Sequence, residues 1–269
     1  MSSVEVEDCG IKQKDSMTHT PLGWAAGNGH EGVVRVLLGR DDIDPSKPGE
    51  DGQTPLCLAA HQGREEVVKI LLGRSDVDPD KPGKVGETPL LQAAYNGCEG
   101  VVKMLLGRVD VDPDKSDERG ETPLLQAASN GYEEVVEMLL GRNDVNPNKT
   151  DENGETPLLR AAFYGHEGVV KIFLGRDDAN PDKSDKDDQT PLLLAASNGH
   201  EGVVKLLLAQ DEVNPGKPDR WGRTPLSWAV ENFHVRVMAL LQHPISATPA
   251  LPKTGEASPS SALGHRTDN

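Results

Sequence analysis

The tripeptide Thr-Pro-Leu occurs seven times in this chain of 269 residues, and each copy starts 34 residues after the one before. The copies begin at Thr20, Thr54, Thr88, Thr122, Thr156, Thr190 and Thr224. A fixed period of this length indicates one supersecondary unit that is reused along the chain. We therefore expect a solenoid, in which each unit packs on its neighbours and no large central core is needed.

Residues 52–85 are the clearest copy of the expected unit, and a short helix is expected in its first half. Thr54 can cap a helix, and Pro55 fits the first helical turn, where a missing N–H has no partner to lose. Apolar residues then recur at i, i+3 and i+4, which marks one face of a short helix. Gly63 suits the left-handed conformation that ends such a helix.

A second helix is expected from about Glu65 to Gly73, with its apolar stripe over residues 67–72. Acidic residues begin this helix and Arg74 follows it, and both charges favour the helix dipole. Pro79 blocks a helical continuation. A proline recurs at this place in six units, as Pro45, Pro79, Pro113, Pro147, Pro181 and Pro215. The unit is therefore helix, tight turn, helix and extended finger, and neither helix is long enough to be stable alone.

The pattern G-x-T-P-L-x-x-A-A-x-x-G-H-x-x-V-V-x-x-L-L matches residues 154–174 except at Phe173. This pattern resembles the ankyrin repeat over about residues 18–243. Phrases close to G-R-x-D-V-N-P-D-K resemble the extended ankyrin arrays of fungal multidomain proteins. The resemblance implies an all-α solenoid of seven stacked helix-turn-helix repeats with finger loops. A leader (1–17) and a Pro- and Ser-rich tail (244–269), expected to be disordered, flank the array.

Several positions depart from the family pattern. The histidine that usually follows T-P-L is absent from every copy, and apolar packing between repeats is expected in its place. The residues at that position are Gly23, Cys57, Leu91, Leu125, Leu159, Leu193 and Ser227. Asp188 replaces a turn glycine but tolerates positive φ. Neither end has the polar face of a good cap, so the leader and tail shield the ends or the chain was cut from a longer array.

Partners of ankyrin repeats usually meet the inner helix and the finger tips on the concave side. By position, the resemblance places the inner-helix contacts at His61, Gln62, Tyr95, Asn96, Ser129, Asn130, Phe163, Tyr164, Ser197 and Asn198. The finger-tip contacts fall at Lys84, Arg119, Asn153, Arg220 and Trp221. Exposed aromatic residues are frequent hot spots, which favours Tyr95, Phe163, Tyr164 and Trp221. Phe163 and Tyr164 have an alternative role in filling a gap between repeats, and Trp24 and Trp228 are expected to pack within the end repeats.

The net charge of −16 bears on the kind of partner. Residues 18–243 carry 24 basic and 38 acidic side chains, so the array should repel nucleic acid and anionic membranes. We expect a monomer that binds a protein with a basic surface. Three cysteines without a C-x-x-C pair, no secretory signal and no long apolar stretch predict an intracellular, cytoplasmic protein, with the nucleus left open.

A calcium-binding solenoid is one alternative to a scaffold. Asp76, Asp78, Asp80 and Glu87 imitate a calcium loop, although Lys81 stands where an EF-hand needs glycine, so a calcium-binding solenoid remains an alternative. The histidines at the turn between the two helices, His30, His166, His200 and His234, are expected to make structural hydrogen bonds. No convergent nucleophile, base or cofactor motif is visible, so we predict a non-enzymatic scaffold without cofactors. A detached sensor portion of a larger signalling receptor is the other alternative.

Overall fold

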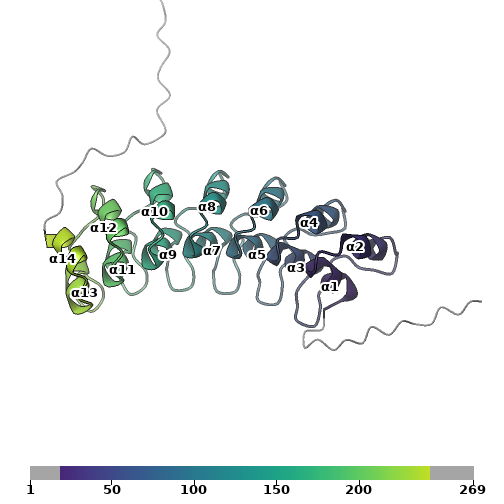
Figure 1. Cartoon of the computed structure of the whole chain (residues 1–269), viewed down its shortest axis with the longest axis horizontal. Helices are drawn as coiled ribbons and strands as arrows, with labels where there is room; N and C mark the ends of the chain where they lie inside the picture. Colours follow the sequence, from purple (N-terminus) through teal and green to yellow (C-terminus); the bar gives the residue numbers. More distant parts are fainter. Residues whose placement is uncertain (1–18, 243–269) are drawn as a thin grey trace, which may run out of the picture. The chain divides into compact units, whose positions relative to one another are not determined.

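The computed structural model describes residues 19–242, and these form 14 helices in seven pairs (Figure 1). The inner helices are α1 (Pro21–Gly27), α3 (Pro55–His61), α5 (Pro89–Tyr95), α7 (Pro123–Asn130), α9 (Pro157–Tyr164), α11 (Pro191–Ser197) and α13 (Pro225–Glu231). The outer helices are α2 (Glu31–Leu38), α4 (Glu65–Leu72), α6 (Glu99–Leu106), α8 (Glu133–Leu140), α10 (Glu167–Leu174), α12 (Glu201–Leu208) and α14 (Val235–Gln242). No strand occurs among the described residues, and the predicted all-α repeat fold is confirmed. The predicted leader and tail fall outside the described range, and no helix within it is long and apolar enough to cross a membrane.

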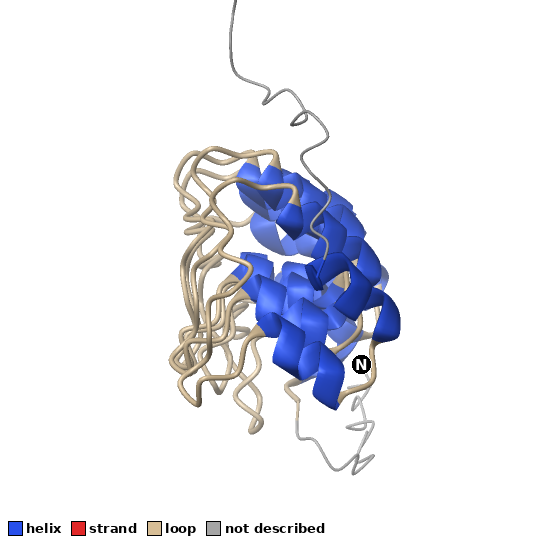
Figure 2. Ribbon diagram, turned by 90° about the vertical axis from the view of Figure 1, so that its left-hand side faces the viewer, coloured by secondary structure: helices blue, strands red, loops and turns tan. Residues whose placement is uncertain are grey.

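The chain divides into two units, which are described separately. The first contains residues 19–127 and 134–146, and the second contains 128–133 and 147–242. In the first unit α3 packs between α1 and α5, and α4 contacts α2 and α6. In the second unit α11 packs between α9 and α13, and α12 contacts α10 and α14. Within each unit the long finger loops leave the helix pairs on the same side (Figure 2).

The Thr-Pro-Leu phrase begins each inner helix, as predicted. The Thr54 hydroxyl accepts a hydrogen bond from the backbone N–H of Cys57 at 3.1 Å, and Pro55 is the first helical residue. Thr20, Thr88, Thr122, Thr156, Thr190 and Thr224 make the same contact. Asp188 has the expected positive φ of 60°, and so does Phe233, which also replaces a turn glycine.

The position of the missing histidine is buried in the interior repeats. Cys57, Leu91, Leu125, Leu159 and Leu193 are at most 2% exposed. Leu193 packs with Leu159 in one apolar cluster. The predicted apolar packing at this position is therefore confirmed, and only the last repeat places an exposed polar residue there, Ser227.

The two end repeats expose surfaces that interior repeats bury. Val33 is 48% exposed, whereas its six equivalents in the other repeats are at most 1% exposed. Those equivalents are Val67, Val101, Val135, Val169, Val203 and Val237. Val230 is 47% exposed, whereas the alanine at its position in the six preceding repeats is fully buried. Among the described residues the first and last repeats thus lack apolar cover on their outward faces.

Arg74 makes a contact that the sequence did not predict. It was expected to favour the negative end of its own helix, α4, but its Nη1 donates to the carbonyl of Leu38 at the end of α2. The same guanidinium binds both carboxylate oxygens of Asp76, at 2.8 and 2.7 Å. Arg108 and Arg142 repeat both contacts one and two repeats later. The arginine therefore satisfies a terminal carbonyl of the preceding repeat, an effect that depends on stacking.

The two described cysteines should differ in reactivity. Burial raises the pKa of the Cys57 thiol to about 11, while Cys98 is half-buried and its pKa is also raised by burial. At pH 8 little of either thiol is ionised, and Cys57 is in addition closed to reagents. We expect iodoacetamide to label native Cys57 at least about ten times more slowly than Cys98, with peptide mass spectrometry as the readout. Equal labelling rates would contradict the buried position of Cys57.

Candidate functional site

Four fingers are anchored by an aspartate that sequence reasoning missed. The Oδ1 atom of Asp151 accepts hydrogen bonds from the N–H groups of Asn153 and Glu155, at 2.9 and 2.8 Å. Asp117, Asp185 and Asp219 make the same pair of bonds. The visible signal is an aspartate five residues before the threonine of Thr-Pro-Leu. These aspartates fix the fold of each finger tip and so fix its exposed side chains.

Neighbouring finger tips are joined by backbone hydrogen bonds. In the first unit the N–H of Glu118 donates to the carbonyl of Val85 at 3.2 Å. In the second unit Lys186 donates to Asn153, and Arg220 donates to Asp187, both at 3.0 Å. The Arg220 guanidinium also pairs with the Asp187 carboxylate at 2.7 Å. Within each unit the fingers therefore form a connected row rather than independent loops.

The fourth residue of several inner helices bonds to the finger of its own repeat, and the residue type at this position differs between repeats. In the second unit Arg160 binds the buried Asp151 at 2.9 Å and also contacts Glu155. Trp228 takes the place of Arg160 in the last repeat, and its Nε1 donates to Asp219 at 3.1 Å. Repeats 3 and 4 use a glutamine here instead, as Gln92 and Gln126. The prediction overlooked this position because its partners depend on the fold of the finger.

The last finger carries an aromatic and cationic cluster, the Trp–Arg cluster, made of Asp219, Arg220, Trp221, Arg223 and Trp228. The Arg223 guanidinium lies 4.8 Å from the ring centre of Trp221 and 3.8 Å from that of Trp228. Its Nε also donates to Asp219 at 3.0 Å. Burial would raise the pKa of Asp219, but hydrogen bonds from Arg223, Trp228 and Trp221 outweigh it and hold that pKa below its usual value. Trp221 remains 57% exposed on this fixed support.

Three more of the favoured aromatic residues end the inner helices. Tyr95 in the first unit is 49% exposed. In the second unit Phe163 and Tyr164 are 39% and 49% exposed, and their rings meet edge to face at 4.8 Å. The backbone carbonyl of Phe163 also accepts a hydrogen bond from Nε2 of His200 at 2.8 Å. Because Phe163 and Tyr164 are both partly exposed to solvent, neither side chain serves only to fill a gap between repeats.

Several predicted polar contacts are used by the fold itself. Asn96 and Asn198 donate to carbonyls of their own helices, each at 2.9 Å, and so cap them. The backbone carbonyls of Ser129 and Ser197 accept from His166 and His234.

The remaining predicted contacts are divided between the units. His61 lies 2.6 Å from Gln92 through its Nδ1, and Gln62 is exposed beside it. Lys84 and Arg119 are exposed on fingers of the first unit. Asn130 and Asn153 are exposed in the second unit. Gln62, Lys84, Arg119, Asn130 and Asn153 are therefore as exposed as the aromatic side chains.

Family models describe the same repeated unit. The model for a single ankyrin repeat matches residues 18–49, and the model for three ankyrin repeats matches residues 39–117, 90–185 and 168–249. These matches span well over half of the chain. The protein belongs to the ankyrin repeat family. A search of curated proteins found no match. Ankyrin repeats generally mediate contacts between proteins, and their proteins are typically non-catalytic.

The structure shows the contacts of the histidines at the helix–helix turns and of the tryptophan in the last inner helix. His166, His200 and His234 each hydrogen bond to a backbone carbonyl of the preceding repeat, as expected of structural histidines. His30 instead lies against Trp24, with ring centres 5.0 Å apart. Trp228 packs on the cluster of Leu159, Leu193 and Leu194, which agrees with packing inside the last ankyrin repeat.

The aspartates that imitate a calcium loop have separate partners. Asp76 pairs with Arg74, and Asp78 accepts from the N–H of Asp80 at 2.9 Å. Asp80 accepts from the N–H of Asp112 in the next ankyrin repeat at 2.8 Å. Within the described residues, no three His, Cys, Asp or Glu side chains come together as a metal site.

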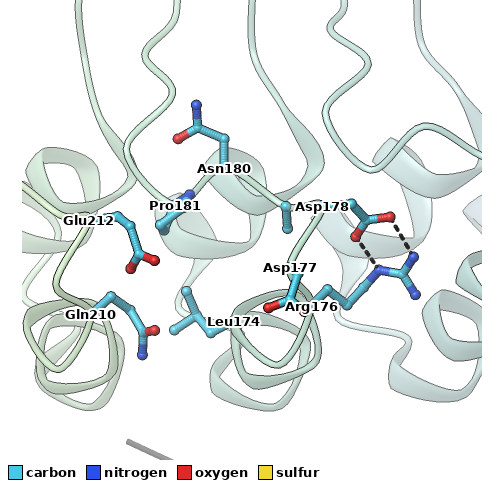
Figure 3. Close-up of a pocket in the computed structure, with 9 residues that line it drawn as sticks. Leu174, Arg176, Asp177, Asp178, Asn180, Pro181, Gln210 and Glu212 are labelled. Carbon is cyan, nitrogen blue, oxygen red and sulfur yellow. Dashed lines mark hydrogen bonds and ion pairs between the residues drawn. The ribbon is translucent and has the colours of Figure 1, made fainter. Parts of the chain in front are cut away.

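A shallow hollow of about 340 Å³ lies between the turns that follow α10 and α12 in the second unit (Figure 3). Leu174, Pro181 and Glu212 contribute to its wall. Asp178 at its edge is held by Arg176 at 2.8 Å, drawn as dashed lines in Figure 3. None of the predicted binding residues lines this hollow, so it is separate from the finger surface of the ankyrin repeats.

Proposed function

We propose that this ankyrin protein is a scaffold that binds another protein through its fingers and the ends of its inner helices. The observation that carries the proposal is the Trp–Arg cluster, where an exposed indole stands at a position that is Asp, Val, Arg or Asn in other repeats. A side chain that differs from those at the same position in the other repeats is not required by the fold that the repeats share. Their placement on an exposed, connected row of fingers is what a binding surface requires.

The Trp–Arg cluster has the features of an interface anchor. Trp and Arg are enriched among residues that dominate binding energy. Trp221 rests against Arg223, which is itself fixed by Asp219, so its ring loses little freedom on binding. Tyr164 and Phe163 offer a second aromatic contact in the same unit. We propose Trp221 and Tyr164 as the principal anchors.

The charge of the fingers supports a partner with a basic surface. The six finger segments are 48–53, 82–87, 116–121, 150–155, 184–189 and 218–223. Together they carry 13 acidic and five basic side chains. Complementary charge speeds encounter and selects among partners. The affinity for such a partner should therefore fall as salt rises, because exposed charges are screened.

The double substitution Tyr164→Ala with Trp221→Ala should weaken partner binding by roughly 30-fold, the loss expected when hot-spot side chains are removed. A cross-linking pull-down from the native cell first identifies candidate partners, and titration calorimetry with the purified candidate then gives the affinity. Val109→Ala is the control, since Val109 is 99% exposed on the turn that follows α6 and is not a finger residue. Equal affinities of the double variant and the wild type would reject this site.

A further inference from the structure

The hollow between the turns that follow α10 and α12 lies at the place where earlier repeats hold an arginine. In three repeats of the first unit, Nη1 of this arginine donates to the last carbonyl of the preceding outer helix, and Nη2 pairs with the aspartate two residues later. The arginines are Arg74, Arg108 and Arg142, at 3.0, 3.0 and 2.8 Å from the carbonyl and 2.7 Å from the carboxylate. Gln210 replaces the arginine in the sixth repeat. The two acceptor places are taken by Leu174 and Glu212, and all three residues line the hollow.

Gln210 does not make the contacts of the arginine that it replaces. Its Nε2 donates to the carbonyl of Leu206 within α12, at 3.4 Å. Among residues 19–242 no donor reaches the carbonyl of Leu174, the last residue of α10. A carbonyl at a helix end is then left to water or to a ligand. Figure 3 shows Gln210 and Glu212 beside Leu174 at one wall of the hollow.

A second change makes more room between the same two turns. Ala179 is partly exposed and stands where four other repeats have a buried valine, as Val77, Val111, Val145 and Val213. Pro181 is also partly exposed, whereas its equivalents Pro79, Pro113 and Pro147 are buried. The smaller alanine and the missing arginine thus leave the acceptors of an arginine site in place and the site itself open.

We propose that this hollow binds the guanidinium group of an arginine supplied by a protein partner. The Leu174 carbonyl and the Glu212 carboxylate would accept its hydrogen bonds, as their equivalents do in the earlier repeats. The carbonyl of Arg176 offers a third acceptor, because the carbonyl of Arg108 accepts from Arg142 at 3.3 Å in the same arrangement. The planar fork of a guanidinium matches several fixed acceptors at once, whereas a lysine ammonium does not. The hollow is separate from the fingers, so this contact is additional to the proposed scaffold surface.

The charge around the hollow favours a cationic occupant. Asp177 and Glu212 are exposed at its wall, and the whole array is acidic. Asp178 is engaged by Arg176 and is not needed for the site. An arginine on a basic partner therefore meets both the complementary charge and the acceptors that bind arginine elsewhere in this chain.

An NMR titration of the full chain with the peptide acetyl-Gly-Arg-Gly-amide tests the proposal. The amide signals of Asp177, Asn180 and Glu212 should shift and saturate, and acetyl-Gly-Lys-Gly-amide should bind at least about five-fold more weakly. Gln210→Arg should lower the affinity for the arginine peptide at least about ten-fold, because the new side chain occupies the site at high effective concentration. Gln210→Lys adds the same charge without the planar fork and should have a smaller effect.

Two further measurements keep the outcome decisive. Gln210→Arg should raise the midpoint of thermal unfolding by roughly 2–4 °C, since it restores the contact between repeats. Glu212→Gln removes one acceptor and should weaken the arginine peptide at least about five-fold.

Three results would overturn the proposal. The first is equal affinity for the arginine and lysine peptides. The second is peptide binding that is unchanged in both Gln210→Arg and Glu212→Gln. The third is a shift of the same amide signals with protein concentration alone, because it would assign the hollow to an arginine of a second copy. The double variant Tyr164→Ala with Trp221→Ala should bind the arginine peptide as the wild type does, so a failure here is distinct from a failure of the finger surface.

Discussion

Leu105→Ala should lower the free energy of unfolding by about 3 kcal/mol, the cost of removing a fully buried leucine and leaving a cavity. Leu105 lies in α6, is 0% exposed, and belongs to the stripe that packs between repeats. An array of this kind gains most of its stability from such contacts between neighbours. The substitution should therefore weaken the coupling between repeats as well as one helix.

Leu37→Ala provides the matched control for that loss. Leu37 occupies the same position in the first repeat but is partly exposed, because no described repeat precedes it. Its replacement should cost about 1 kcal/mol or less, as expected where less apolar surface leaves water. Urea unfolding followed by circular dichroism gives both values. Equal losses for the two variants would mean that stacking contributes little at this position.

Asp219→Ala should destabilise the last finger by about 2 kcal/mol, because it leaves several donors without an acceptor. The carboxylate is fully buried and accepts from the backbone of Trp221 and Arg223 and from the side chains of Arg223 and Trp228. Asp219→Asn should cost less, since it keeps one oxygen for the backbone donors. The exposed Asp76→Ala is the control and should produce no measurable change.

The effect of Asp219→Asn should depend on pH in one direction. The pKa of Asp219 lies below its usual value, since hydrogen bonds to the carboxylate outweigh the effect of burial. A carboxyl group of this kind stabilises the fold above its ordinary pKa of about 4, and the contribution is lost as pH falls through the lower folded value. The stability gap between wild type and Asp219→Asn should therefore be full at neutral pH and shrink below about pH 4. A gap that grows on acidification would contradict the assigned hydrogen bonds.

The fold was predictable because its determinants are local and repeated. Thr54, Pro55 and Gly63 define the ends of one helix by their own conformational preferences, and the period carries that prediction to every repeat. The contact of Arg74 with Leu38 was not predictable in the same way. It joins residues 36 positions apart and depends on how one repeat stacks on the next.

The candidate site was predictable only in part for a related reason. Exposed Trp221 and Tyr164 follow from their positions in the repeat. The support beneath Trp221 does not, because Asp219 and Trp228 meet only after the finger folds back on α13. Asn96 and Asn198 occupy the expected surface, yet their amides cap their own helices, which reduces what they offer a partner.

Site-specific photo-cross-linking tests most directly the claim that a protein partner docks on the fingers and inner-helix ends. A photoreactive phenylalanine analogue replaces Trp221, Tyr164 or, as the control, the fully exposed Val109, and the chain is irradiated in its native cell. We expect one shared covalent adduct from positions 221 and 164 and none from position 109. An adduct that forms at position 109 while positions 221 and 164 stay unreacted would contradict it.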